Sequence, residues 1–132
     1  AIPAVKQGLL PDSFGTDLHR FSMNTGMKNM LDIMSKYLNI GMSLQEVIYR
    51  ATWNSATSIK RNDLGHISEG AVADIVILNL RKGSFGFVDT KGNRLDGDKK
   101  LEAEMTIREG KIVWNLNGLG SESWLNDQKL KF

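Results

Sequence analysis

The first half of the chain carries apolar side chains at the spacing of an α-helix. Between Thr25 and Gly41 the apolar positions follow the i, i+3, i+4, i+7 and i+11 pattern of one helical face, at Met27, Met30, Leu31, Met34 and Leu38. Gly41 stands where a glycine commonly ends a helix, because glycine accepts the left-handed backbone needed there. We therefore predict an amphipathic helix over this stretch.

A second helix is predicted by a local start signal. Ser43 and Glu46 have the spacing of a capping box, in which each side chain bonds the backbone N–H of the other residue. Met42 and Val47 lie on either side of it at the spacing of a hydrophobic staple. These signals predict a helix from Leu44 to about Thr52.

The polar stretch that follows separates two halves with different periodicity. Asn54 is expected to cap a further short helix that ends near Ile59, because its side-chain oxygen can accept from the exposed amides of a first turn. The break lies near residues 61–65. Beyond it, apolar residues alternate with polar ones or form short runs bounded by glycine, which is the pattern of β-strands.

The second half is predicted to form hairpins. Residues 101–107 alternate strictly, as expected for a strand with one solvated face. Glu109 and Gly110 suit a two-residue hairpin turn. We expect strands at residues 74–78, 85–88, 101–107 and 111–114, with turns at 89–93 and 109–110.

Composition and charge exclude several classes of protein. The chain has 132 residues, of which 41% are hydrophobic and 24% charged, as in ordinary globular domains. The net charge of +2 is too small to indicate a nucleic-acid-binding surface. No apolar run approaches the roughly 18 residues of a membrane span. The absence of cysteine is typical of a reducing compartment, so we expect a cytoplasmic protein.

Few residues can carry chemistry. The two histidines, His19 and His66, are far apart in the sequence, so a self-contained histidine-rich metal site is not encoded. If residues 16–19 are extended, Asp17 and His19 project to the same side, where a carboxylate and an imidazole would suit metal binding or proton transfer. From spacing alone, the preferred interpretation of Asp17 is a local turn or cap residue that bonds nearby backbone amides.

Other candidates have simpler structural explanations. His66 follows a Leu-Gly turn and is expected at the surface, and Asp74 is expected to tie down a turn at a strand start. The methionines at helical spacing could form a flexible recognition surface, but core packing is the favoured interpretation. They are Met23, Met27, Met30, Met34 and Met42.

Several segments occur together in an order that resembles a known family. They are Thr16–His19, Gly41–Ile48, Ala51–Ala56, Leu64–Val76 and Thr106–Trp114. This order resembles the C-terminal end of the amidohydrolase superfamily, and within it the dihydroorotase-like amidohydrolase and deacetylase group. The resemblance covers about residues 9–116.

The resemblance implies an α/β architecture. Family members are (β/α)8 TIM barrels with a small β-sandwich built from both chain ends. Residues 1–62 would then be the end of the catalytic barrel, with its last strand near Asp17, and residues 63–118 the C-terminal part of the sandwich. Residues 119–132 are expected to form a tail, ordered only if Trp124 or Phe132 finds a groove. Because Ala1 is not an initiating methionine, we expect a chain that begins inside a longer protein.

The resemblance also implies a function. The position of Asp17 matches a family aspartate that contacts the metal and acts as general base toward the hydrolytic water. His19 beside it is a candidate for binding substrate or orienting Asp17, and a structural hydrogen bond is an equally good explanation of this histidine. The implied reaction is hydrolysis of a small-molecule amide or cyclic amide with a divalent metal, foremost zinc. The other family ligands have no counterpart here, so we expect the isolated chain to be inactive and to need the rest of the barrel, a complementing chain or self-association. The alternative is a non-catalytic interaction or assembly module that retains the sandwich.

Overall fold

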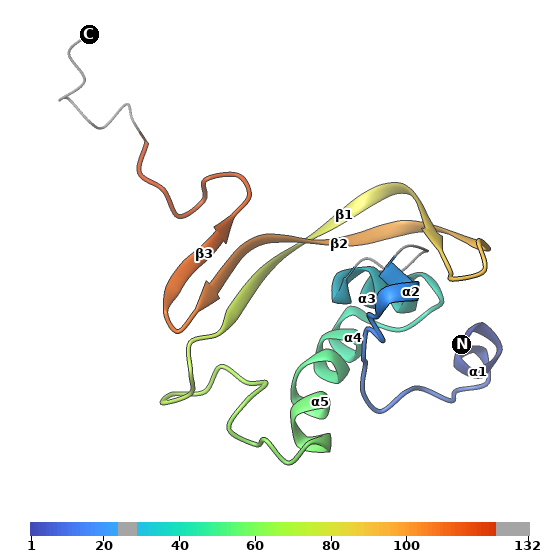
Figure 1. Cartoon of the computed structure of the whole chain (residues 1–132), viewed down its shortest axis with the longest axis horizontal. Helices are drawn as coiled ribbons and strands as arrows, with labels where there is room; N and C mark the ends of the chain where they lie inside the picture. Colours follow the sequence, from blue (N-terminus) through green and yellow to red (C-terminus); the bar gives the residue numbers. More distant parts are fainter. Residues whose placement is uncertain (24–28, 124–132) are drawn as a thin grey trace, which may run out of the picture.

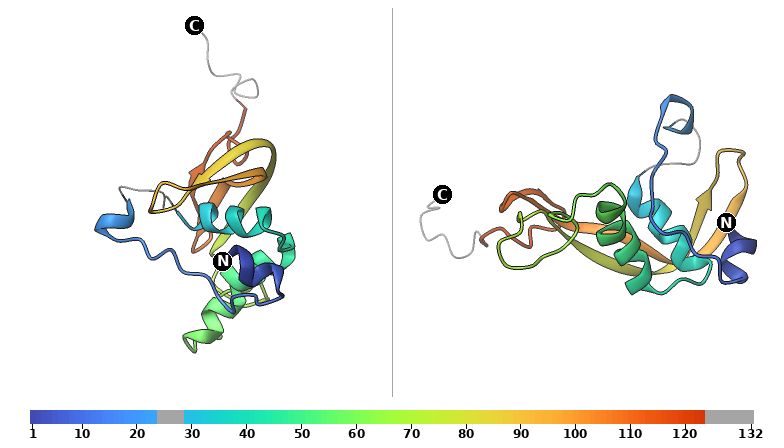
Figure 2. Two further views of the ribbon diagram at one scale, coloured as in Figure 1. Left: turned by 90° about the vertical axis from the view of Figure 1, so that its right-hand side faces the viewer. Right: turned by 90° about the horizontal axis from the view of Figure 1, so that it is seen from below.

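Residues 1–23 and 29–123 are described by a computed structural model. Short helices lie along one side of a long, twisted β-hairpin (Figure 1). Two further views show that β3 (Lys111–Asn115) and α1 (Ile2–Lys6) lie toward opposite ends of the molecule (Figure 2). The elements in order are α1 (Ile2–Lys6), α2 (Arg20–Met23), α3 (Met30–Asn39), α4 (Leu44–Ala51), α5 (Trp53–Ser58), β1 (Ile75–Val88), β2 (Arg94–Arg108) and β3 (Lys111–Asn115).

The helix-start and helix-end features predicted from the sequence are found in α3 and α4. The Ser43 hydroxyl accepts from the Glu46 N–H at 3.2 Å, and the Glu46 carboxylate accepts from the Ser43 N–H at 3.4 Å, so the capping box is confirmed. Gly41 follows the last residues of α3 with φ +115°, which agrees with its predicted place after the helix. The start of α3 is capped by Asn29, and residues 25–28 of the predicted helix lie outside the described part.

The prediction that Asn54 caps α5 is wrong. The helix begins two residues earlier than predicted, at Trp53, with Thr52 in the capping position. Because α4 and α5 follow one another almost directly, Asn54 already lies within the first turn. Its side-chain amide instead donates to the carbonyl of Asp12 at 3.0 Å.

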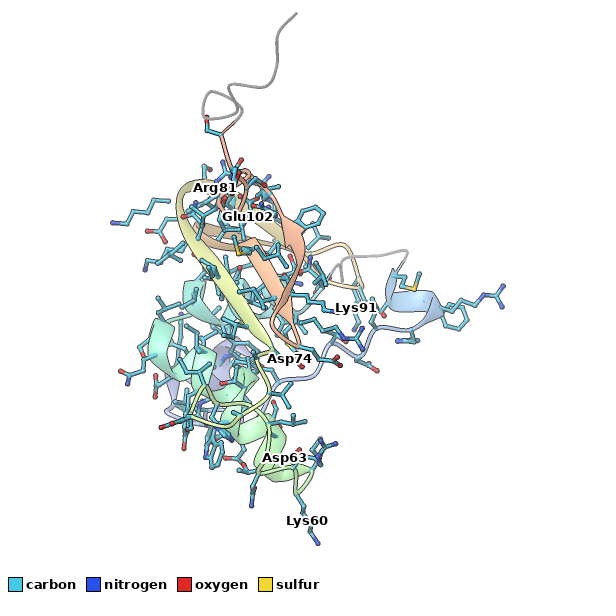
Figure 3. All side chains as sticks on the ribbon, turned by 90° about the vertical axis from the view of Figure 1, so that its left-hand side faces the viewer. Lys60, Asp63, Asp74, Arg81, Lys91 and Glu102 are labelled. Atoms are coloured by element: carbon cyan, nitrogen blue, oxygen red, sulfur yellow. The ribbon has the colours of Figure 1, made fainter. Side chains whose placement is uncertain are left out.

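The second half forms a three-stranded antiparallel sheet in the order β1-β2-β3. The turn at Glu109 and Gly110 is confirmed, since both residues have positive φ, as a two-residue hairpin turn requires. The two short strands predicted at 74–78 and 85–88 are parts of one strand, β1, which pairs with β2 along most of its length. Arg81 on β1 and Glu102 on β2 form an ion pair at 3.4 Å across this hairpin (Figure 3).

The hydrophobic core joins both halves of the chain. It lies between α3, α4 and the hairpin, and its buried members are Phe14, Ile33, Met34, Leu38, Met42, Val47 and Leu101. Leu78 and Leu80 of β1 pack against it from the sheet side. The core therefore crosses the boundary predicted between residues 62 and 63, and the division into two domains stays a prediction.

The predicted barrel strand around Asp17 is not formed in the described structure. Residues 14–19 lie outside helices and strands, since the described part offers no neighbouring strand for them to bond. The described residues contain one sheet, so the sandwich also stays a prediction. Trp124 and Phe132 of the predicted tail lie outside the described residues. Within the described ranges, none of the helices has the length and apolar character needed to cross a membrane.

Candidate active site

The segment that leads to Asp17 is anchored to the helices at its beginning. Phe14 is buried, and its ring stacks on that of Tyr37 with 4.6 Å between centroids. The guanidinium of Arg50 donates to the carbonyl of Pro11 at 2.7 Å. Asp17 follows Phe14 by only three residues, so these contacts restrict where its backbone can lie.

Asp17 lies in an irregular segment, outside helices, strands and turns. Its φ of +47° is in the left-handed region, which aspartate tolerates better than most residues because its side chain is short and polar. The extended backbone that would have placed Asp17 and His19 on one side by strand alternation is therefore not found at Asp17. The Asp17 side chain is 97% exposed, so its carboxylate is open to solvent or to another molecule.

The side chains of Asp17 and His19 nevertheless lie close together. Their Oδ1 and Nδ1 atoms are 3.8 Å apart, and the His19 side chain is 52% exposed. His19 Nδ1 lies 2.7 Å from the backbone carbonyl oxygen of Asp17. The sequence placed the two side chains on one side only if the segment was extended; in the structure they lie close together with a left-handed backbone at Asp17.

The alternative explanation of Asp17 as a capping residue is weakened by this geometry. Among the described residues, no backbone amide donates to the Asp17 carboxylate. The hydrogen bonds that hold Asp17 in this segment are made by its backbone carbonyl, which leaves the carboxylate unused by the fold. An exposed carboxylate of this kind can accept a proton or coordinate a cation.

These two side chains fit a metal ion only in part. Carboxylate and imidazole groups are both ligands that zinc accepts, but a protein zinc site takes at least three protein ligands. No three His, Cys, Asp or Glu side chains gather closely enough to hold an ion within residues 1–23 and 29–123. Asp17 and His19 could thus supply part of a metal site whose remaining ligands come from elsewhere.

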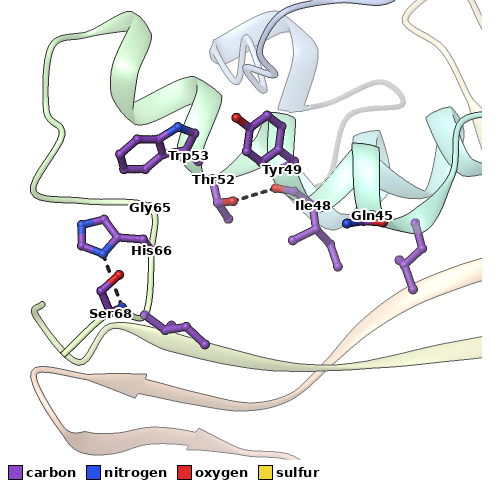
Figure 4. A pocket seen from close by; sticks show the side chains of 10 residues that line it. Gln45, Ile48, Tyr49, Thr52, Trp53, Gly65, His66 and Ser68 are labelled. Carbon is purple, nitrogen blue, oxygen red and sulfur yellow. Dashed lines mark hydrogen bonds between the residues drawn. The ribbon is translucent and has the colours of Figure 1, made fainter.

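A separate open groove, not predicted from the sequence, lies between α4 and the loop at residues 65–68 (Figure 4). Its volume is about 860 Å³, and its walls include Leu44, Ile48, Trp53, His66 and Ile67. Leu44 and Ile48 are one helical turn apart, on a different face from the buried Val47. This second apolar face of α4 was the feature of the sequence from which the groove could have been predicted. Neither Asp17 nor His19 lines this groove.

His66 is less exposed than expected. It is partly buried, and its ring packs edge-on against Trp53 with 5.5 Å between centroids. Asp74 has the predicted structural role, because its carboxylate accepts from the Glu109 N–H at 2.8 Å and so ties down the hairpin turn.

The methionines divide between core and surface. Met34 and Met42 are buried in the core and Met30 packs against it, which confirms the predicted packing role for these three. Met23 is exposed in the described structure, so its predicted packing against neighbouring barrel elements stays a prediction, and Met27 lies outside the described residues.

The most strongly shifted acid lies away from Asp17. A hydrogen bond from the Arg61 guanidinium lowers the pKa of Asp63 from 3.8 to about 2. The same contact raises the pKa of Arg61. Both side chains are more than half exposed, at the surface beyond α5, so they form a local surface pair.

Comparison with known proteins places this geometry in context. Residues 1–113 match the Amidohydrolase family. A deacetylase of Brucella anthropi is 37% identical over 90 residues, which make up 68% of this chain and 22% of that protein. The chain thus spans about a fifth of the length of the curated deacetylases it matches.

Solved structures show where the fold recurs. The structure superposes on an adenine deaminase with a TM-score of 0.81 at 23% identity, covering 87% of this chain and 32% of that one. A dihydroorotase matches with a TM-score of 0.73 at 27% identity, covering 86% of this chain and 31% of that one. These neighbours are TIM-barrel amidohydrolases, matched over part of their chains.

Proposed function

Because this chain belongs to the amidohydrolase family, we propose that it forms part of a metal-dependent enzyme that hydrolyses the C–N bond of an amide or cyclic amide. The family match over residues 1–113 is the observation that carries this proposal. The names of its relatives, a deacetylase and a dihydroorotase, support a small-molecule substrate with such a bond.

Asp17 is the proposed general base. Its carboxylate is solvent-exposed and not engaged by the fold, so it is available to take a proton from the hydrolytic water. The water oxygen then bonds to the carbonyl carbon, the C–N bond breaks, and Asp17 returns the proton to the leaving nitrogen. His19, within 3.8 Å of the same carboxylate, is placed to contact the substrate.

The proposed metal is a divalent ion, with zinc as the first candidate. When bound, such an ion would polarise the scissile carbonyl and lower the pKa of water, so that a weakly basic carboxylate suffices as base. Asp17 is the proposed ligand from this chain, and the remaining ligands would come from a partner segment.

The proposed architecture is the end of a barrel, residues 1–62, followed by the C-terminal strands of a sandwich, residues 63–118, and a tail, residues 119–132. The exposed apolar groove beside α4 supports this arrangement, since helices at the outside of a complete barrel bury their apolar faces against neighbouring elements. The rest of the barrel, or a complementing or self-associating chain, is the proposed partner, and the isolated chain is proposed to be inactive.

A chimera tests this function directly. Residues 1–113 replace the equivalent stretch of the Brucella anthropi deacetylase, and the chimera and the isolated chain are assayed with added zinc on a panel of N-acetylated amines and cyclic amides. We expect hydrolysis by the chimera and none by the isolated chain. A folded chimera that hydrolyses nothing while the parent deacetylase is active would favour the non-catalytic module. Hydrolysis by the isolated chain at the rate of the chimera would contradict the proposed incompleteness.

A further inference from the structure

The backbone carbonyl of Asp17 is the centre of a small hydrogen-bond network. It accepts from the Ser22 hydroxyl at 2.8 Å and lies 2.7 Å from His19 Nδ1. A carbonyl oxygen has no hydrogen to give, so the hydrogen between these two atoms belongs to Nδ1. In the neutral ring this leaves Nε2 as the nitrogen with the free lone pair.

Ser22, in α2, completes this hydrogen-bond network. Its side chain is the buried one in this segment, with 4% of the residue exposed, whereas Asp17 and His19 are open to solvent. Its oxygen accepts from the His19 N–H at 2.8 Å while its hydrogen faces the carbonyl of Asp17, with that of His19 at 3.2 Å. One hydroxyl thus joins the backbones of the two candidate site residues.

These hydrogen bonds explain how Asp17 keeps an unusual backbone conformation. Its φ of +47° is unfavourable for a residue with a Cβ and persists only where surrounding contacts enforce it. Among the described residues, its carbonyl is contacted by the Ser22 hydroxyl and by His19 Nδ1. Without the Ser22 hydroxyl the carbonyl would be free to turn away from His19 Nδ1, and the ring would lose the contact that selects its tautomer.

We propose that Ser22 is a positioning residue: by holding the Asp17 carbonyl against His19, it fixes the neutral ring as the Nδ1–H tautomer and presents Nε2 as a hydrogen-bond acceptor for an N–H group of the amide substrate. This inference rests on the proposed function for the identity of the substrate only. The tautomer itself is a property of the free chain. Among the described residues no group bonds Nε2, and the half-exposed ring leaves it accessible.

The tautomer is measured by long-range ¹H–¹⁵N NMR of the imidazole rings in the ¹⁵N-labelled 132-residue chain, at about pH 9. His66→Gln removes the other histidine and so assigns the signals. We expect the Nδ1–H form of His19 to dominate in the native chain. The ratio of Nδ1–H to Nε2–H should fall by about two- to ten-fold in Ser22→Ala, as expected for loss of one ordering hydrogen bond. Ser22→Thr, which keeps the hydroxyl, should restore it, and Ser58→Ala on the exposed face of α5 should leave it unchanged.

A dominant Nε2–H form in the native chain would overturn the proposal without recourse to any variant. So would an unchanged tautomer ratio in Ser22→Ala. In the chimera, Ser22→Ala is expected to lower kcat/KM for amides and Ser22→Thr to retain it; a shifted tautomer with unchanged kcat/KM would overturn the acceptor role of Nε2. A chimera that hydrolyses nothing, with the Nδ1–H form intact, would instead count against the proposed function alone.

Discussion

The hydroxyl of Ser35 in α3 accepts a hydrogen bond from the backbone N–H of Leu101 in β2, at 2.9 Å, and donates to the carbonyl of Leu31 at 2.6 Å. Ser35 is fully buried and Leu101 nearly so. Since β3 pairs only with the last residues of β2, the N–H of Leu101 points to an edge of the sheet that no strand covers in the described part. Helix α3 therefore supplies a hydrogen-bond acceptor for this edge of β2 through the Ser35 side chain.

Ser35→Ala should destabilise the chain markedly. The substitution leaves the Leu101 N–H buried without a partner, which costs about 1–3 kcal/mol in the free energy of unfolding. Urea denaturation followed by circular dichroism measures this value. Ser58→Ala, on an exposed helix surface, is the control and should stay within about 0.5 kcal/mol of the native chain. Equal effects of the two substitutions would show that the edge contact contributes nothing.

Gly65→Ala tests the close approach of the 65–68 loop to the junction of α4 and α5. Gly65 has φ +78°, and a Cβ there would lie 2.8 Å from the backbone carbonyl of Thr52. Gly70 has a similar φ, +82°, in open space, so Gly70→Ala should cost only the about 1–2 kcal/mol of the left-handed backbone. Gly65→Ala should cost about 1–3 kcal/mol more, because backbone must move to admit the methyl group. Matching unfolding free energies for the two variants would contradict the close approach.

The Arg61–Asp63 pair should be visible in a pH titration. The pKa of Asp63 is lowered from 3.8 to about 2, so the pair stabilises the folded chain fully above pH 3.8, and this contribution is lost as the pH falls toward about 2. NMR of the Asp63 carboxyl carbon measures the midpoint. Arg61→Gln should raise it toward the ordinary value, whereas Arg81→Gln, at a distant ion pair, should not. A native midpoint near 3.8 would mean that the pair is not formed in solution.

Local signals in the sequence predicted local structure well. The capping box of Ser43 and Glu46 and the turn at Glu109 and Gly110 each depend on residues within a few positions of one another, and both are confirmed. The full length of β1 was not predicted. Its middle residues are polar and do not alternate with apolar ones, and only their backbone pairing with β2 makes them part of the strand.

Contacts between distant segments could not be predicted in the same way. Ser35 is a polar residue on a predicted core-facing helix. Its burial is explained by its hydrogen bond with the backbone N–H of Leu101, which belongs to the second half of the chain. At the candidate site, Asp17 and His19 were identified from the sequence, and an extended backbone was considered as the way to bring them together. The Asp17 carbonyl that lies against His19 also accepts from the Ser22 hydroxyl, and Ser22 gave no recognisable pattern in the sequence.

The central claim, that the Asp17 carboxylate is the base of an amide hydrolase, is tested most directly by Asp17→Asn in the chimera with the Brucella anthropi deacetylase. Asp12→Asn is the matched control, since Asp12 is exposed in the same segment and engages Asn54 only through its backbone carbonyl. We predict that Asp17→Asn lowers kcat by about 100-fold or more, in the range of general base catalysis, while Asp12→Asn leaves it unchanged. A kcat for the Asp17→Asn chimera equal to that of the Asp12→Asn chimera would contradict the claim.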